Sequence, residues 1–315
     1  MHTSYKRFKL RVIYPIVIWL QNLIFGKRAK SNNDKNYNDP FFIIGSGRNG
    51  STLLGGMLNT NNNVFIPPEQ YVLGYSLLKW NLKRYKKWEA ISSEIINDFQ
   101  KDKNTCNWNT SLEAFKADVK TTIEEKRNFS NLIGGIFNFY ALSKNKTFTI
   151  YGDQSPITTH FSKRLIKEFS ESKFIILIRD PRDVVLSYSK IKDHPARNMS
   201  HALWKWNDSI ETYDYLKKFN RGNILSIKYE DLVSNPKDSL ILVCDFLNIQ
   251  YNEQMLDTSK SAENLGVKKL NIHANLSKKI NTSAVGKWKE ELNKNQINKI
   301  NNLTKTNRLR FGYDD

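Results

Sequence analysis

Cysteine is nearly absent from this chain, whose 315 residues contain only Cys106 and Cys244. The two form no CxxC pair and have no metal-ligand spacing, and the histidines have no such spacing either. This argues against a disulfide framework and a metal-stabilised module, and it favours a reducing compartment. Cys244 lies in the apolar segment SLILVCDFL, so we expect it in the core.

Long hydrophobic runs are also missing. The apolar stretch near the N-terminus covers residues 12–25 and is interrupted by Pro15, Gln21 and Asn22. A membrane-spanning helix needs about 20 apolar residues, and no signal-peptide cleavage site is evident. We expect residues 1–39 to form a separate basic and apolar segment that contacts a membrane through residues 12–25. A first helix docked on the domain and a single-pass anchor are the alternatives.

Acidic side chains are scarce relative to basic ones: 31 Asp and Glu against 49 Lys and Arg give a formal net charge of +18. Such a charge suggests a phosphorylated cofactor, an acidic acceptor, a nucleic acid or a membrane surface. The lysines are scattered, and no base-stacking motif is visible. A nucleic-acid-binding module is therefore the weakest of these hypotheses, and it would predict steeply salt-dependent binding.

Apolar segments alternate with helical patterns from residue 40 onward. The expected strands cover residues 41–44, 63–70, 147–156, 173–178 and 223–232. The expected helices cover residues 51–59, 157–169, 180–190, 201–219, 234–249 and most of the chain after 285. This alternation predicts an α/β fold with a parallel sheet flanked by helices. We expect residues 40–315 to form one domain, with a helical acceptor-binding insertion at 73–145.

The segment FIIGSGRNGSTLL, residues 42–54, has the order of a phosphate-binding loop but lacks the lysine. A Walker-type loop carries Lys immediately before the Ser-Thr pair, where this chain has Gly50. Arg48 can supply the missing charge, but not a proton. The residues expected to bind an anion at the start of the following helix are Gly47, Arg48, Asn49, Gly50, Ser51 and Thr52.

A second candidate site follows the apolar segment KFIILI. Arg179 stands at its carboxyl end, Arg182 lies in the first turn of the expected helix, and Ser187 lies further along that helix. Arginine near a helix N-terminus is electrostatically unfavourable unless an anion is present. The three residues therefore predict a second phosphate site. The alternative is a pair of solvated arginines with Asp180 and Asp183 as partners.

Together, GSGRNGSTLLGGMLN and KFIILIRDPRDVVLSYS resemble the sulfotransferases that use 3'-phosphoadenosine-5'-phosphosulfate (PAPS). The resemblance implies a sulfotransferase fold similar to that of P-loop nucleoside triphosphate hydrolases, with PAPS as co-substrate and no metal. It further implies that Arg48, Gly50, Ser51 and Thr52 hold the 5' end of the nucleotide. Arg179 and Ser187 would then hold its 3'-phosphate.

Two further segments extend the resemblance along the chain. ILSIKYEDLVSNPKDSLILVCDFLNI is similar to a strand and a Pro-started helix of the family, which places Tyr229 near the nucleotide. SAVGKWKEEL is similar to the loop that closes over the 3'-phosphate, which points to Ser283, Gly286, Lys287 and Trp288. An arginine in place of the loop lysine is typical of the tyrosylprotein-type, bacterial and carbohydrate sulfotransferases.

In the tyrosylprotein type, a glutamate shortly after the first helix is the catalytic base, and Glu69 stands where that residue would fall. The alternative is a surface glutamate near a turn. Many relatives have a lysine in the segment that matches YGDQSP, where this chain has Gln154. Whether Gln154 takes that lysine's role cannot be read from the sequence. Asp153 remains as a polar neighbour that could orient the acceptor.

We therefore expect a sulfotransferase that moves a sulfuryl group from PAPS to a hydroxyl acceptor by in-line displacement. Glu69 would be the base, and Arg48 would stabilise the leaving oxygen. Carbohydrate, tyrosine and lipid-linked acceptors all fit. A P-loop kinase or nucleotide hydrolase is the alternative, which Gly50 disfavours, and no nucleic-acid partner is expected. We expect a cytoplasmic, membrane-associated enzyme, and the sequence does not predict its oligomeric state.

Overall fold

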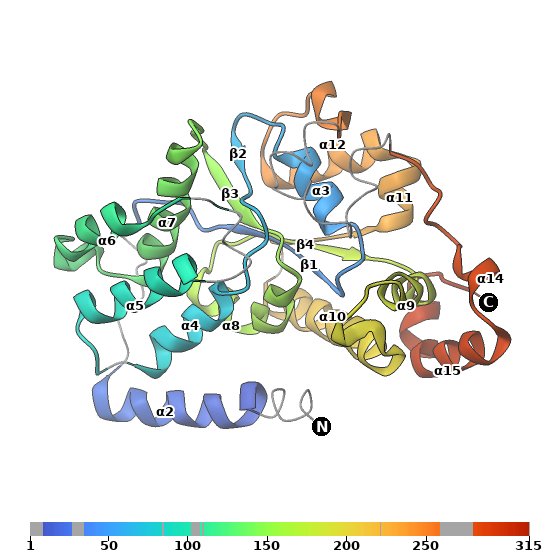
Figure 1. The fold of residues 1–315 in the computed structure, drawn as a ribbon, viewed down its shortest axis with the longest axis horizontal. Helices are drawn as coiled ribbons and strands as arrows, with labels where there is room; N and C mark the ends of the chain where they lie inside the picture. Colours follow the sequence, from blue (N-terminus) through green and yellow to red (C-terminus); the bar gives the residue numbers. More distant parts are fainter. Residues whose placement is uncertain are drawn as a thin grey trace.

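The computed structural model describes residues 9–26, 35–83, 85–101, 108, 110–220, 222–258 and 280–314. Cys106 lies outside these residues. A parallel five-stranded sheet with the order β2-β3-β1-β4-β5 forms the centre of the molecule (Figure 1). The strands are β1 (Phe41–Gly45), β2 (Val64–Phe65), β3 (Ile150–Asp153), β4 (Phe174–Ile178) and β5 (Ile224–Lys228). The predicted α/β class with a parallel sheet is confirmed.

Helices cover both faces of this sheet and extend beyond one of its edges. The α-helices are α2 (Tyr14–Phe25), α3 (Ser51–Leu58), α4 (Leu73–Leu82), α5 (Trp88–Lys101), α6 (Glu113–Lys120), α7 (Phe129–Ser143), α8 (Ser162–Glu168), α9 (Pro181–Ser189), α10 (Met199–Phe219), α11 (Tyr229–Ser234), α12 (Pro236–Leu247), α14 (Trp288–Glu291) and α15 (Lys294–Arg310). Shorter turns are the π-helix η1 (Lys9–Ile13) and the 3-10 helices η3 (Glu124–Lys126), η4 (Pro156–Phe161), η5 (Pro195–Arg197) and η6 (Glu253–Leu256).

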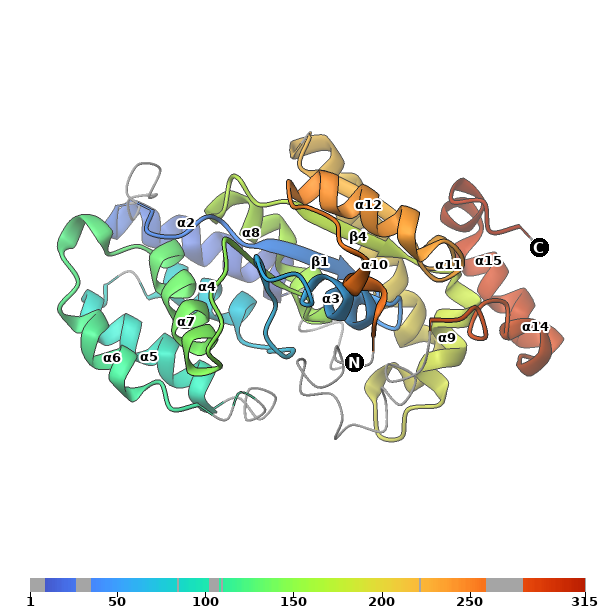
Figure 2. The ribbon, with the colours of Figure 1, turned by 90° about the horizontal axis from the view of Figure 1, so that it is seen from above.

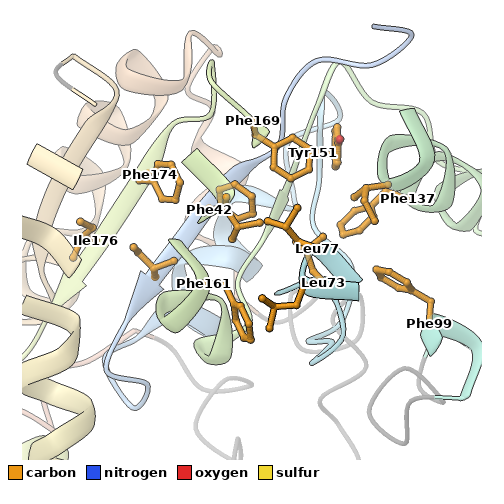
Figure 3. Close-up of a cluster of buried hydrophobic side chains, with 14 of the residues drawn as sticks. Phe42, Leu73, Leu77, Phe99, Phe137, Tyr151, Phe161, Phe169, Phe174 and Ile176 are labelled. Atoms are coloured by element: carbon orange, nitrogen blue, oxygen red, sulfur yellow. The ribbon is translucent and has the colours of Figure 1, made fainter. Parts of the chain in front are cut away.

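Alternating side chains of β1 enter two separate cores. Phe42 faces the larger core, where its ring centroid lies 5.0 Å from that of Phe174, and Leu73 and Leu77 of α4 pack into the same cluster (Figure 3). Ile43 faces the opposite core, which α3 and α12 cover (Figure 2). A strand that is apolar on both faces must be buried on both, because exposing either face would leave apolar surface in water.

The expected helical insertion corresponds to α4–α7, which lie beside the β2–β3 edge of the sheet (Figure 1). Trp108 joins this insertion to the sheet region. Its indole stacks on Tyr140 with 4.2 Å between ring centroids, and its Nε1 donates a hydrogen bond to the Pro68 carbonyl at 3.3 Å. The insertion therefore packs directly against the segment that carries Glu69. Its role in acceptor binding stays a prediction.

Three expected elements differ from the structure. The expected strand 63–70 is shortened to β2, Val64–Phe65, ahead of Pro67 and Pro68. The expected helix 157–169 begins as the 3-10 helix η4 and becomes α-helical only at α8. Tertiary bonds explain the tighter turn, because Thr158 donates to the Asp153 carboxylate at 2.5 Å and Thr159 donates to the Gly45 carbonyl at 2.8 Å. The expected strand 223–232 ends at Lys228, the last residue paired with β4. Tyr229 then begins the helix α11.

The N-terminal helix α2 packs against α4 at the outer edge of the molecule (Figure 1). It contains 12 residues. Within the part of the chain that the structure describes, no helix combines the length and apolarity needed to cross a membrane.

Candidate active site

The loop between β1 and α3 lies at the carboxyl end of the sheet, where ligands of open parallel α/β folds bind. Gly50 precedes α3 with φ +92, and no side chain caps the helix N-terminus. A Cβ at Gly50 would lie 2.6 Å from Cδ2 of Tyr229. Two features therefore disfavour a lysine in place of Gly50. The backbone is left-handed there, which L-residues rarely adopt, and the Tyr229 ring occupies the space that the side chain would need. The uncapped helix N-terminus is available for an anion.

Arg48 brings the two predicted phosphate motifs into direct contact. Its Nε donates a hydrogen bond to the Ser187 hydroxyl at 3.1 Å, and its carbonyl accepts one from Arg179 Nη1 at 2.8 Å. Arg48 itself adopts a left-handed backbone with φ +57. Burial lowers the pKa of its guanidinium, but an arginine stays protonated in a protein. Arg48 and Arg179 thus face one region, as the two-site hypothesis requires.

Arg179 connects three segments that lie far apart in the sequence. Besides the Arg48 carbonyl, it donates from Nη2 to the Ala284 carbonyl at 2.6 Å. Its guanidinium carbon lies 4.4 Å from the centroid of the Tyr229 ring. Its Nε is buried and has no hydrogen-bond partner among the described residues. Arg179 therefore contacts both other predicted nucleotide residues: it lies over the ring of Tyr229 and donates a hydrogen bond to Arg48.

Arg182 is not part of this arginine cluster, so that part of the second-site prediction is wrong. Its guanidinium forms a bidentate ion pair with Asp180 and donates to the Asp314 carbonyl at 2.8 Å. Its guanidinium carbon lies 3.7 Å from the centroid of the Trp288 ring. The ion-pair alternative holds for Arg182 and Asp180 alone, and that pair is buried rather than solvated. A buried charge needs such a partner, and Asp180 is only two residues away.

The segment SAVGKWKEEL, residues 283–292, which we call the late loop, is bound to α9 through Asp183. This carboxylate accepts hydrogen bonds from the backbone N–H of Gly286 at 2.7 Å and of Trp288 at 3.0 Å. Trp288 is buried, whereas Ser283 and Lys287 are exposed. Together with the Ala284 bond to Arg179, these contacts place the predicted loop beside the second arginine motif. Binding of a nucleotide by this loop stays a prediction.

The side chains of Asn49 and Tyr188 hold the loop between β1 and α3, which we call the phosphate loop, in place. The Asn49 amide donates to the Leu177 carbonyl of β4 at 2.8 Å, so its side chain holds the loop to the sheet. The Tyr188 hydroxyl donates to the Ser46 carbonyl at 2.8 Å. A Cβ at Gly47 would lie 2.3 Å from that hydroxyl. The sequence analysis missed Tyr188, although it directly follows the predicted Ser187.

Glu69 lies beside α3, as its predicted role requires. Thr52 Oγ1 and the Tyr71 hydroxyl donate to its two carboxylate oxygens at 3.3 and 3.4 Å. The side chain is partly exposed. Burial raises the pKa of Glu69 to about 7, with a further increase from the charge of Asp153, while Thr52 and Arg48 oppose the shift. A carboxylate with this pKa can exchange protons near neutral pH.

The neighbouring segment of β3 plays a different part from the one expected. Asp153 accepts hydrogen bonds from Gln70, Ser155 and Thr158 at 3.0, 2.7 and 2.5 Å, and it is buried. Its carboxylate therefore organises the protein and is not free to orient an acceptor. The Gln154 side chain is buried against Gly55 of α3, and both its amide atoms lack a partner among the described residues.

A lysine that the sequence analysis did not select also faces this region. Lys205 of α10 lies with its Nζ 5.8 Å from the centroid of the Tyr188 ring. The charges of Asp208 and Glu69 both act on it. No local pattern pointed to it, because its sequence neighbours Trp204 and Trp206 in LWKWN point in other directions around the helix.

Fold and loop together are those of a P-loop-like α/β protein in which Gly50 stands at the position of the loop lysine and Arg48 lies in the same loop. The chain belongs to the sulfotransferase family, whose model matches residues 40–253. The resemblance predicted from the two motifs is confirmed, and the protein is a sulfotransferase.

Individual relatives are distant. Protein-tyrosine sulfotransferase 1 of Danio rerio is 23% identical over 288 residues, which cover 85% of this chain and 73% of that protein. Protein-tyrosine sulfotransferase 2 of Gallus gallus is 30% identical over 109 residues, which cover 33% of this chain and only 29% of that protein. The solved sulfotransferase domain of the Synechococcus PCC 7002 olefin synthase superposes with a TM-score of 0.57 at 22% identity, covering 92% of this chain and 100% of that domain.

We expect Arg179→Met to destabilise the protein even without a ligand. The substitution removes the charged donor of two part-buried hydrogen bonds, to the Arg48 and Ala284 carbonyls, and a hydrogen bond to a charged group contributes about 1.5–3 kcal/mol. Urea denaturation of the purified variant measures this loss. Lys287→Met is the matched control, because Lys287 is an exposed cation of the same late loop. Equal unfolding free energies for the two variants would refute the bridging role of Arg179.

Proposed function

We propose that this sulfotransferase takes its sulfuryl group from PAPS and transfers it to a hydroxyl acceptor. The supporting observation is the 2.8 Å hydrogen bond from Arg179 to the Arg48 carbonyl. It makes two anion-binding motifs, at the ends of β1 and β4, neighbours in one site. A donor that carries anionic groups at both its 5' and 3' positions needs two such motifs within reach of one nucleoside.

The chain's residues fit this donor. The backbone of Gly47, Gly50 and the first turn of α3 offers N–H groups to the 5' end, with Arg48, Ser51 and Thr52 as charged and hydroxyl donors. Arg179 and Ser187 would hold the 3'-phosphate, to which Arg179 has an unpartnered buried Nε to offer. The ring of Tyr229 and the late loop would enclose the nucleotide. PAPS, when bound, supplies the activated sulfuryl group.

Glu69 is the proposed base. Its carboxylate is held by Thr52, a residue of the same helix N-terminus that would hold the 5' end of the donor. This contact supports a base at the same end of α3 as the proposed site for the transferred group. As the acceptor hydroxyl attacks, Glu69 would take its proton. A pKa of about 7 suits this step, because the carboxylate form is present at neutral pH and still has appreciable basicity.

Arg48 would stabilise the charge that builds up on the leaving oxygen. Its role is electrostatic, because a guanidinium cannot readily give up a proton. The names of the relatives make a peptide tyrosine the first acceptor to test, with carbohydrate and other hydroxyl acceptors next.

We expect the desulfated product 3'-phosphoadenosine-5'-phosphate (PAP) to raise the melting temperature of the protein in the presence of EDTA. Binding to the folded state at about one hundred times Kd adds about 2.7 kcal/mol of stability. ATP with Mg²⁺ at equal concentration should give no comparable shift. Differential scanning fluorimetry makes the comparison. Stabilisation by ATP with Mg²⁺ and none by PAP would refute the PAPS proposal and favour the kinase alternative.

We expect Glu69→Gln to reduce kcat by about 10²–10⁴-fold, the usual contribution of a general base. The variant should keep the PAP-induced thermal shift, because Glu69 would touch the acceptor rather than the nucleotide. In the wild type, log kcat should rise with unit slope below the pKa of about 7 and level off above it, because only the carboxylate accepts a proton. Glu69→Gln should lose this rise.

The control for this experiment is Arg48→Ala. Loss of one oxyanion donor typically raises a barrier by about 2.7–4 kcal/mol, and this variant should also weaken the PAP shift. A fully active Glu69→Gln would show that the base assignment is wrong while leaving the donor assignment intact. Turnover is followed with a sulfur-labelled donor.

A further inference from the structure

Helix α2 exposes a continuous apolar face. The fractional exposures of its apolar side chains are 54% for Ile16, 60% for Trp19, 45% for Leu20, 65% for Leu23 and 70% for Ile24. These five positions follow the spacing i, i+3, i+4, i+7, i+8, so they share one side of the helix. We call them the outer face of α2. Large apolar side chains gathered in this way mark an interaction surface, whereas scattered ones do not.

The opposite side of α2 is already occupied by the domain. Tyr14 and Ile18 pack against the main core cluster, and α2 contacts α4. The ring of Phe25 lies 6.2 Å from that of Tyr85. The helix is thus docked at the outer edge of the molecule (Figure 1), and the residues of its outer face are exposed.

The positive charge of the N-terminal sequence indicates what kind of surface binds to the outer face of α2. The first 30 residues of the sequence contain seven Lys and Arg and no Asp or Glu, and the basic residues stand on both sides of the apolar helix. Basic clusters next to an apolar helix are attracted to anionic lipid headgroups. A second copy of this chain would bring the same positive charges together, so self-association through this face is electrostatically opposed.

We propose that the outer face of α2 lies flat in the headgroup region of an anionic membrane. The apolar side chains enter the boundary with the acyl chains, and the positive net charge of the first 30 residues of the sequence attracts the anionic headgroups. Trp19, whose ring is apolar and whose N–H is polar, suits this depth. The helix has 12 residues, which fits binding in the plane of the membrane rather than across it.

The test is co-sedimentation of the full chain with lipid vesicles. The wild type should pellet with vesicles of phosphatidylcholine and phosphatidylglycerol and much less with phosphatidylcholine alone. The double variant Leu23→Glu/Ile24→Glu should lose at least about tenfold in vesicle affinity, because it places two charges in the apolar boundary. Leu303→Glu is the matched control, since Leu303 on α15 is 54% exposed and lies outside the outer face.

PAP-induced thermal shifts show that each variant is folded. Failure of the wild type to bind anionic vesicles, or equal binding by the wild type and the double variant, would overturn the proposal. So would a concentration-dependent dimer that the double variant abolishes, because the occupant would then be a second copy.

A second, independent observation concerns Lys205 and rests on the proposed function. Lys205 projects from α10 toward Tyr188, the residue that holds the phosphate loop through Ser46. Burial lowers its pKa to about 8, with Asp208 and Glu69 opposing the shift. Asp208 pairs with His160 at 2.6 Å. Among the described residues, no carboxylate lies within ion-pair distance of Lys205 Nζ.

We infer that Lys205 contacts the oxygens of the transferred sulfuryl group. Lys205 is a partly buried ammonium beside Tyr188, with no ion pair among the described residues and with the charge of Glu69 acting on it. Such a group is a site for a negatively charged ligand. The sulfuryl oxygens carry such charge during transfer, and they must lie between the donor at Arg48 and the base at Glu69. Lys205 would then be a catalytic residue that the motifs do not reveal.

We expect Lys205→Met to lower kcat by about 10-fold or more while keeping the PAP-induced thermal shift, because PAP lacks the sulfuryl group. Lys205→Arg, which keeps the charge, should restore part of the activity. The acidic limb of the kcat profile should move to higher pH in Lys205→Met, since Glu69 loses a nearby cation. The other groups that face Glu69 are Asp153, Arg48, Tyr71 and Tyr188, and all remain in the variant.

The outcomes separate this inference from the proposed function. A wild type that does not bind PAP refutes the proposed function itself. Normal PAP binding together with an unchanged kcat and pH profile in Lys205→Met refutes only the role of Lys205. A loss of kcat that Lys205→Arg does not relieve, with no shift of the profile, would indicate a structural role and also overturn the inference.

Discussion

The arrangement of this enzyme depends on one guanidinium, that of Arg179. It donates to the carbonyls of Arg48 and Ala284 and lies over the ring of Tyr229. Four segments separated by long stretches of sequence therefore meet at one side chain. An arginine suits this position because its planar fork can donate in several directions at once and stays charged when buried. Its two donated hydrogen bonds link the phosphate loop to the late loop.

The charges near the site are divided between structural and free roles. Asp153 and Arg182 are both buried, and both are held by protein partners: Asp153 accepts three hydrogen bonds, and Arg182 pairs with Asp180. Among the described residues, Glu69 accepts two long side-chain hydrogen bonds, and the residue is partly exposed. Arg48 and Lys205 surround it with positive charge. This division explains how a chain with net charge +18 can keep one carboxylate reactive, because most of the charge lies elsewhere on a solvated surface.

Much of the fold was predictable because its strands are short apolar runs and its helices have clear starts. The segment FFII predicted a buried strand, and Asp180 before Pro181 predicted the start of α9, where the Asp180 side chain caps the Arg182 N–H. The elements that were predicted wrongly are those whose conformation depends on distant partners. The 3-10 turn η4 follows from bonds to Asp153 and Gly45, and the end of β5 follows from the length of β4.

The sequence by itself determined the family, the parallel α/β class and the residues that carry the two arginine motifs, because these depend on local patterns of apolar, glycine and basic residues. Only the tertiary structure decided which charges are free to act. Arg182 and Arg179 are three residues apart and chemically identical, yet one is bound to Asp180 and the other reaches the loops. Lys205 has no local motif at all. Which partners a charged side chain finds depends on distances in space, and sequence spacing does not contain them.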